Sequence, residues 1–306
     1  MTKVFIDGSA GTTGLKIRER LSVRKDVEVT VLADEVRKDP AARLSAAEKA
    51  DVVFLCLPDD AAREAAAAYR DLEAVIIDTS TAHRCDPGWT YGMPELGFGE
   101  KIAASKRIAN PGCHATGFIA LAKPLRDAGL LRSDAALSCF SLTGYSGGGK
   151  KMIASYEDPR RSPLLKAPGQ YALSQSHKHL PEMKKFCSLE KEPVFCPVVG
   201  DFYSGMEVTL PLFKEDLTAG FGEVRAVYEK IYRGPVIAFD AGLGDLGTLS
   251  AALMSGKDSM KIGLFGNEDR MIAAALFDNL GKGASGAAIQ NMNVALGLDE
   301  TLGLEL

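Results

Sequence analysis

The first third of the chain alternates short apolar runs with amphipathic stretches. Short apolar runs are typical of strands buried on both faces of a parallel sheet. The intervening stretches repeat apolar residues at helical spacing, as Ile17 and Leu21 do. Strands that alternate with helices predict a doubly wound, Rossmann-type α/β domain. The predicted strands are Lys3–Asp7, Val27–Val31, Val52–Leu57 (ended by Pro58) and Val75–Ile77, and the predicted helices are Leu15–Leu21 and Ala61–Tyr69.

The pattern changes after about residue 112. A helix over Cys113–Ala128, ended by Gly129, is followed by longer apolar runs. In Met206–Phe213 apolar and polar residues alternate, which indicates an antiparallel strand with one solvated face. The second part is therefore predicted to be α+β with a mainly antiparallel sheet. Its other strands are expected at Ala135–Thr143 and Pro193–Val199, and its helices near Gly222–Tyr232 and near Arg270–Leu280. A last helix is expected from about Ala287.

A glycine-rich turn joins the first predicted strand to the first predicted helix. Its Gly-x-x-Gly-x-x-Gly spacing lets the backbone approach a pyrophosphate, whose charge then meets a helix N-terminus. The alternative is a turn needed only for tight packing. At the first βα junction of a chain that continues as βαβ, we favour dinucleotide binding. The residues predicted to hold the cofactor here are Gly8, Ser9, Ala10, Gly11, Thr12, Thr13 and Gly14.

The second strand leaves the type of dinucleotide open. Asp34 stands about where a carboxylate holds the ribose of NAD. Arg37 and Lys38 follow it and suit the extra phosphate of NADP.

Composition narrows the class of protein. The 306 residues are 46% hydrophobic, and the net charge of −4 gives no electrostatic reason to expect a nucleic-acid partner. No apolar run approaches the ~20 residues of a membrane span, and Asp7 interrupts the N-terminus too early for a signal peptide. The six cysteines form no Cys-x-x-Cys pair. We expect free thiols in the reducing cytoplasm.

Cys113 stands out among these cysteines. A Pro-Gly turn delivers it to the first turn of a predicted helix, where backbone N–H groups and the helix dipole stabilise a thiolate. The same N–H groups can bind a developing oxyanion. The alternative is a small residue packed at a helix start. Downstream of a dinucleotide-binding fold, we interpret Cys113 as a covalent nucleophile.

A thiol nucleophile needs a partner that moves protons. His114 is adjacent to Cys113, so its side chain is expected to project elsewhere on the helix. His177 and His179 are the better candidates, because in an extended segment they share one face, with Glu182 in the helix that Pro181 begins. Which histidine is the acid or base stays open. A zinc site at this His-x-His pair lacks further ligands at suitable spacing, so no metal cofactor is expected.

With these motifs in this order, the chain closely resembles the shorter type of the N-acetyl-γ-glutamyl-phosphate reductases. This family belongs to the aspartate-semialdehyde dehydrogenase-like superfamily. The resemblance covers nearly the whole chain. It rests on Gly8–Gly14, on the segment Asp78–Arg84 that contains Ser80, on Tyr91–Leu96, on Asn110-Pro111-Gly112-Cys113, on His177–Glu182, and on Gly281–Gly286 with Gln290–Asn293.

The resemblance implies an activity and a set of residues. The family reduces N-acetyl-L-glutamyl 5-phosphate with NADPH through a cysteine thioester in arginine biosynthesis. It implies cofactor contacts at Ser80 and substrate contacts at Asn110 and Glu182. The anionic substrate requires cations, for which Arg84 is the first candidate and Lys150 the second, ahead of Arg160 and Arg161, whose alternative is a solvated surface.

The resemblance also implies an organisation. Residues 1–112 and 284–306 are expected to form the NADP-binding domain. Residues 113–283 are expected to form a catalytic and oligomerisation domain, which assembles a homodimer or homotetramer.

Two other interpretations stay open. One is the same chemistry on aspartyl or aminoadipyl phosphate. The other is a regulator that binds NADP without turning it over, which would need the glycine turn but neither Cys113 nor the two histidines.

Overall fold

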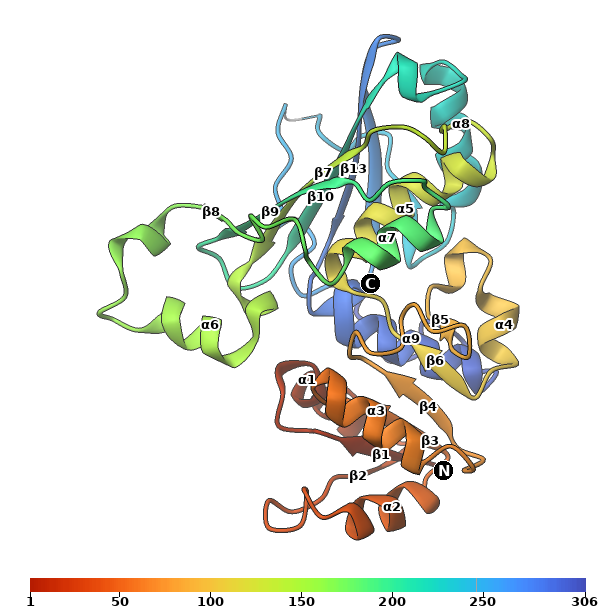
Figure 1. Ribbon diagram of the computed structural model, residues 1–306, viewed down its shortest axis with the longest axis vertical. Coiled ribbons are helices and arrows are strands. Elements are labelled where there is room, and N and C mark those ends of the chain that lie inside the picture. The colour runs from red at the N-terminus through yellow and green to blue at the C-terminus, as the bar shows by residue number, and fades with distance from the viewer. Residues whose placement is uncertain (246) are drawn as a thin grey trace. The chain divides into compact units, whose positions relative to one another are not determined.

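The computed structural model describes residues 1–245 and 247–306, and the chain divides into two compact units. The first unit comprises Met1–Gly112 and Ala284–Leu304, and the second comprises Cys113–Gly283 with the last two residues. Each unit has its own sheet (Figure 1). Among the described residues, every helix is too short or too polar to cross a bilayer.

The first unit contains a six-stranded sheet in the order β2-β1-β3-β4-β6-β5, in which every pair runs parallel. This confirms the predicted parallel sheet. β3 ends at Leu55, two residues before the predicted end, and Pro58 instead precedes the next helix as its cap. The strands are β1 (Thr2–Asp7), β2 (Val27–Thr30), β3 (Val52–Leu55), β4 (Val75–Asp78), β5 (Thr90–Tyr91) and β6 (Arg107–Ala109).

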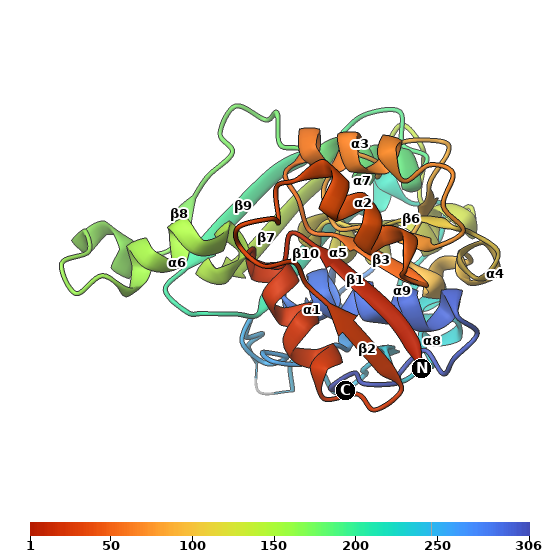
Figure 2. The ribbon, with the colours of Figure 1, turned by 90° about the horizontal axis from the view of Figure 1, so that it is seen from below.

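Helices cover both faces of this sheet, as Figure 2 shows around β1. Val4 and Ile6 of β1 pack with one group of helices, and Phe5 between them packs with the other, as alternation along a strand requires. The doubly wound arrangement is therefore confirmed. One face carries α1 (Thr12–Ser22), α4 (Gly99–Ala103) and α9 (Gly286–Ala295), and the other carries α2 (Pro40–Glu48) and α3 (Asp59–Ala68).

The second unit contains a seven-stranded sheet in the order β11-β12-β13-β10-β7-β9-β8. Four of its six pairings are antiparallel, which confirms the predicted class. Its strands are β7 (Ser138–Gly144), β8 (Gly169–Gln170), β9 (Val194–Gly200), β10 (Met206–Phe213), β11 (Ile237–Phe239), β12 (Met260–Gly266) and β13 (Arg270–Phe277). Its helices include α5 (Cys113–Asp127), α7 (Leu180–Phe186) and α8 (Phe221–Ile231), of which α5 packs on β10 and β13.

The helix predicted near Arg270–Leu280 is wrong, because these residues form β13. The alanines favour a helix locally, but Ala273, Ala274 and Ala275 hydrogen-bond to β10 on one side and β12 on the other. Small side chains suit this place because α5 packs directly over the strand. Tertiary pairing has overridden local propensity.

The sheet face opposite α5 exposes apolar side chains. Phe140 of β7 is 39% exposed, Val194 of β9 is 58% exposed and Ile272 of β13 is 45% exposed. The strand registers place all three on this one face. We call it the open face.

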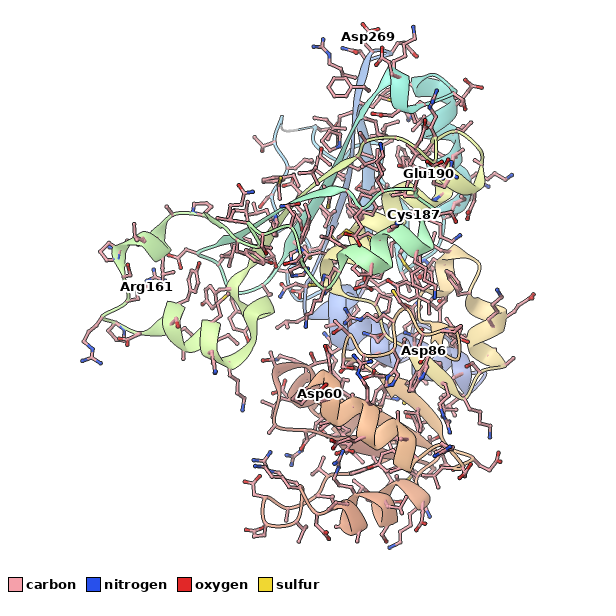
Figure 3. The ribbon with its side chains drawn as sticks, in the orientation of Figure 1. Asp60, Asp86, Arg161, Cys187, Glu190 and Asp269 are labelled. Atoms are coloured by element: carbon pink, nitrogen blue, oxygen red, sulfur yellow. The ribbon has the colours of Figure 1, made fainter. Side chains whose placement is uncertain are left out.

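A segment with α6 (Gly149–Glu157) extends sideways from this sheet in Figures 1 and 2. Figure 3 labels Arg161 within it, and the Arg161 guanidinium pairs with Asp201 at 2.6 Å. Arg160 is almost fully exposed beside Asp158. The alternative interpretation of Arg160 and Arg161 as surface cations therefore fits their positions.

Candidate active site

The β1–α1 turn is a tight backbone loop that requires glycine at two positions. Gly8 has φ +95°, and a Cβ there would lie 2.4 Å from the Cys56 carbonyl oxygen. A Cβ on Gly14 would lie 2.7 Å from the Gly8 carbonyl oxygen. Gly11 caps α1 without a side chain, and α1 has no acidic residue in its first turn. Its leading N–H groups are thus suited to an anion.

A cavity of about 340 Å³ opens beside this turn. Gly8, Ser9, Arg37 and Lys38, all predicted to hold cofactor, line it together with Arg43. Arg43 is a cation that the sequence analysis missed. Its Nη2 donates to the buried Asp7 carboxylate at 2.8 Å, and Tyr69 Oη donates to the same carboxylate at 2.9 Å. The Asp7 charge is thereby compensated within the wall.

Asp34, the residue that favoured NAD, lies in a solvated position. Its carboxylate pairs with Arg37 Nε at 2.9 Å, and its side chain is 88% exposed. It is not among the described residues that line the cavity. The cavity wall therefore presents the Arg37 and Lys38 cations, while the Asp34 carboxylate stays outside.

The segment after β4 is fixed by buried polar contacts. Ser80 Oγ and His83 Nδ1 both contact the fully buried Asp78 carboxylate, at 2.8 and 2.6 Å. Arg84 is buried, and it donates from Nε to the Asn110 carbonyl and from Nη2 to the Thr79 carbonyl. One Arg84 donor group thus holds the backbone before the cysteine turn, and another holds the segment after β4.

Asn110 anchors that turn to the C-terminal segment of the first unit. Its Nδ2 donates to the Ala284 carbonyl at 3.0 Å, and its Oδ1 accepts from Asn291 Nδ2 at 3.1 Å. Both ends of the Asn110 amide are engaged. Sequence analysis identified Asn291 only as part of a motif, without this partner.

Cys113 is the first residue of α5 and is partly exposed. The chain passes very close to it at Gly283, where a Cβ would lie 2.9 Å from the Cys113 Cβ. A glycine is therefore required opposite the cysteine. This contact gives a physical reason for Gly283 in the C-terminal motif.

His114 does not project away from this cluster, so the expectation for it is wrong. It is buried, with Nδ1 2.7 Å from Ser141 Oγ on β7 and Nε2 2.7 Å from the Tyr171 hydroxyl. Its ring centroid lies 5.5 Å from that of His179. Neither Ser141 nor Tyr171 carried a sequence signal, because pairing in the sheet brings them to α5.

His177 and His179 lie together just before α7, with ring centroids 4.6 Å apart. The segment is not extended, the condition on which the shared face of the two histidines was inferred, because His179 has helical backbone angles. Its N–H donates to His177 Nδ1 at 3.2 Å. Pro181 does occupy the first turn of α7, as predicted, and the buried Glu182 carboxylate lies 4.0 Å from His179 Nε2.

The surroundings fix the protonation of this cluster. Burial, and then the charge of His177, lower the pKa of His114 to about 3, so His114 is neutral at physiological pH. Burial also raises the pKa of Tyr171, and the neighbouring Cys113 adds to that effect by disfavouring a second negative charge. Tyr171 therefore stays a neutral hydroxyl.

Curated relatives match the sequence of this chain along almost their whole length. An N-acetyl-gamma-glutamyl-phosphate reductase of Brucella canis is 46% identical over 96% of this chain and 99% of that protein. One of Brucella melitensis is 45% identical with the same coverage. The chain belongs to the N-acetyl-gamma-glutamyl-phosphate reductase family.

Family models divide this reductase chain into two parts. The model described as "Semialdehyde dehydrogenase, NAD binding domain" matches residues 3–105. The one described as "Semialdehyde dehydrogenase, dimerisation domain" matches residues 113–279. The second match begins at Cys113.

Solved structures of aspartate-semialdehyde dehydrogenases have the same fold as this reductase. Enzyme II of Vibrio cholerae, complexed with ASA, aligns with TM-score 0.70, 17% identity, 97% of this chain and 98% of that chain. The Candida albicans enzyme with NADP aligns with TM-score 0.68, 15% identity, 96% of this chain and 98% of that chain. At these identities the likeness shows the fold alone.

Proposed function

We propose that this protein reduces N-acetyl-L-glutamyl 5-phosphate to N-acetyl-L-glutamate 5-semialdehyde and phosphate, with NADPH, in arginine biosynthesis. The observation that carries the proposal is the partly exposed Cys113 at the start of α5, beside His179 and His114. A helix start stabilises a thiolate, and an imidazole can move its proton. The 46% identical relatives bear the name of this activity.

The chemistry then follows from the residues of the chain. The Cys113 thiolate attacks the acyl carbon, and phosphate leaves, so that a thioester forms. The leading N–H groups of α5 stabilise the oxyanion. The dinucleotide, when bound, supplies the hydride that the thioester carbonyl accepts. His179 or His177 returns a proton as the thiohemiacetal collapses and the aldehyde departs.

NADP is proposed as the dinucleotide. The β1–α1 turn, Gly8–Gly14, would hold the pyrophosphate at the α1 N-terminus. Arg37 and Lys38 on the cavity wall would meet the extra phosphate, which is a dianion that arginine binds well. Ser80 is proposed to contact the dinucleotide as well. The solvated, paired state of Asp34 supports NADP over NAD.

The substrate is proposed to be held by charged and polar side chains. Arg84 and Lys150 would attract its carboxylate and phosphate charges, and Lys150 is exposed at the start of α6. The buried Glu182 would accept from the acetamido N–H. Asn110, whose side-chain amide is engaged on both sides, would contribute by holding the cysteine turn.

The protein is proposed to act as a cytoplasmic homo-oligomer. No disulfide joins the cysteines in the described part of the chain, which suits a reducing compartment. The open face is an apolar surface within the part matched by the dimerisation model. An isologous dimer would bury it on both copies.

The decisive experiment is phosphate-dependent reduction of NADP⁺ with N-acetylglutamate 5-semialdehyde, with aspartate semialdehyde in parallel. We expect turnover of the acetylated aldehyde only. Cys113→Ser should lower kcat by at least about 1,000-fold, because a nucleophile is essential to the whole sequence of steps. Cys85→Ser, at an exposed thiol, is the matched control and should retain full activity.

Turnover of aspartate semialdehyde alone would move the proposal to the aspartyl substrate. Tight NADP binding without turnover of either aldehyde would support the non-catalytic regulator. Preference for NAD over NADP, measured as the ratio of kcat/KM values, would refute the role given to Arg37 and Lys38.

A further inference from the structure

The cluster around Cys113 contains a set of metal-ligating atoms that the sequence spacing did not reveal. The Cys113 Sγ and one ring nitrogen each of His114 and His179 all lie within 4.8 Å of one another. His179 of the His-x-His pair is one of these ligands, and His114, which follows Cys113 in the chain, is another. The ligands missing from the sequence argument are therefore supplied by the fold.

We propose that Cys113, His114 and His179 form an inhibitory site for Zn²⁺ and similar borderline divalent ions. The ion binds in competition with the acyl phosphate, because both require the Cys113 sulfur. The inhibition rests on the proposed role of Cys113 as nucleophile, whereas the binding itself does not.

The donor set selects the class of ion. One thiolate and two neutral imidazoles are ligands that zinc prefers, while Mg²⁺ and Ca²⁺ require oxygen ligands. Three protein ligands leave a fourth tetrahedral position for water. Cys113 is partly exposed, so an ion from solvent can reach the sulfur.

The geometry requires only a small closure. Zinc ligands at about 2.0–2.3 Å from the ion lie within roughly 4 Å of one another. The three atoms, which lie within 4.8 Å of one another, must therefore approach by up to about an ångström when the ion binds. His114 is already oriented, because its Nδ1 contacts the buried Ser141 hydroxyl. Such outer contacts orient imidazole ligands in metal sites.

Coordination of the zinc ion requires no oxidant or reductant. The Cys113 thiol loses one proton to solvent and its sulfur binds the ion. His114 coordinates through the Nε2 lone pair, and the Tyr171 hydroxyl moves from that nitrogen to the metal-bound water. The carboxylate of Glu182, near His179, adds a compensating negative charge.

The test uses the full chain without nucleotide or substrate. Alkylation of Cys113 by iodoacetamide is followed by mass spectrometry at increasing free Zn²⁺, with Cys85 in the same molecule as the control thiol. At zinc tenfold above Kd, alkylation of Cys113 should slow about elevenfold, because only one site in about eleven is free. Cys85 should be alkylated at an unchanged rate, and Mg²⁺ should protect neither thiol.

Variants and spectroscopy identify the ligands. His114→Phe and His179→Phe should each weaken zinc binding by roughly 100-fold or more, since even outer contacts are worth 10–100-fold. Wild-type protein with Co²⁺ gives the same information without a variant. A thiolate-to-cobalt charge-transfer band and paramagnetically shifted protons from two histidines are expected.

Several results would overturn the site. These are alkylation of Cys113 unaffected by zinc, a cobalt spectrum without a thiolate band, shifted signals from fewer than two histidines, or unchanged zinc affinity in a folded His114→Phe variant. If the protein binds zinc with these features but has no reductase activity even in the absence of zinc, the metal site is supported and only the proposed function is refuted.

Discussion

His114 shows how a single buried side chain is held in one charge state. Its two ring nitrogens contact the Ser141 and Tyr171 hydroxyls, both of which are neutral groups. A charged imidazole there would be desolvated, and His177 stands close enough to oppose the charge. The fold therefore stabilises the neutral form.

This arrangement predicts a pH dependence of stability. The pKa of His114 is about 3 in the folded protein and near 6.5 when unfolded, so the unfolded chain binds the extra proton between these values. The stability contributed by neutral His114 is complete above pH 6.5 and is lost as pH falls toward 3. The loss approaches at most about 1.4 kcal/mol per pH unit.

The measurement is urea unfolding at several pH values with a chelator present, for wild type and His114→Gln. The glutamine cannot take up a proton, so the wild-type advantage should shrink as pH falls. His177, His179, Tyr171 and Cys113 face the same ring, and they remain in both proteins. A difference that stays constant from pH 7 to pH 4 would refute the neutral state.

Sequence analysis identified site residues that are marked by a local pattern in the chain. It missed residues that come to the site only through the pairing of strands in the sheet. Cys113 was found because a Pro-Gly turn and a helix start are visible in the chain. The Tyr171 hydroxyl contacts His114 only in the folded chain, and the spacing of the two residues in the sequence does not predict this contact. The prediction for His114 failed because adjacency along a helix was taken to exclude it from the site, although a long side chain at the next position can return to the same cluster.

At the scale of elements, α5 and the strands beneath it are fitted by small residues. Gly117 of α5 faces β10 and β13, and a Cβ there would lie 2.5 Å from Val208 Cγ2 and 2.9 Å from Phe277 Cε1. The alanine-rich segment of β13 was predicted to be a helix. Small residues are common in helices, but they also occur where a strand packs closely against another layer. Local composition therefore predicts the element poorly wherever two layers touch.

Gly117→Ala is expected to destabilise the protein although alanine is the better helix former. Helix propensity gains about 1 kcal/mol, but overpacking a fixed core costs about 1–3 kcal/mol. The free energy of unfolding should fall, by up to about 2 kcal/mol, in denaturant titrations. Gly222→Ala in α8 is the control, because a Cβ there meets nothing within 4 Å, and stability should stay level or rise. A gain for Gly117→Ala would show that the layers can separate freely.

At the scale of the whole molecule, the two sheets differ in how they are covered. The parallel sheet of the first unit has helices on both faces, as parallel sheets generally do. The sheet of the second unit has helices on one face and the open face on the other. The alternation of apolar and polar residues in strands such as Met206–Phe213 predicted this solvated face. Alternation alone does not show whether water or a second copy of the chain covers the face.

An exposed apolar sheet face of this kind is expected to be buried by self-association. Phe140→Asp places a charge at the middle strands of the open face, where an isologous dimer would bring two such charges together and desolvate them. We expect the mass measured by light scattering to fall to that of a single chain at micromolar concentration. Val23→Asp changes a residue that is 80% exposed in the first unit, and it should leave the mass unchanged. An unaltered oligomer in Phe140→Asp would show that the assembly uses another surface, and monomeric wild-type protein would show that this apolar face is stable in water.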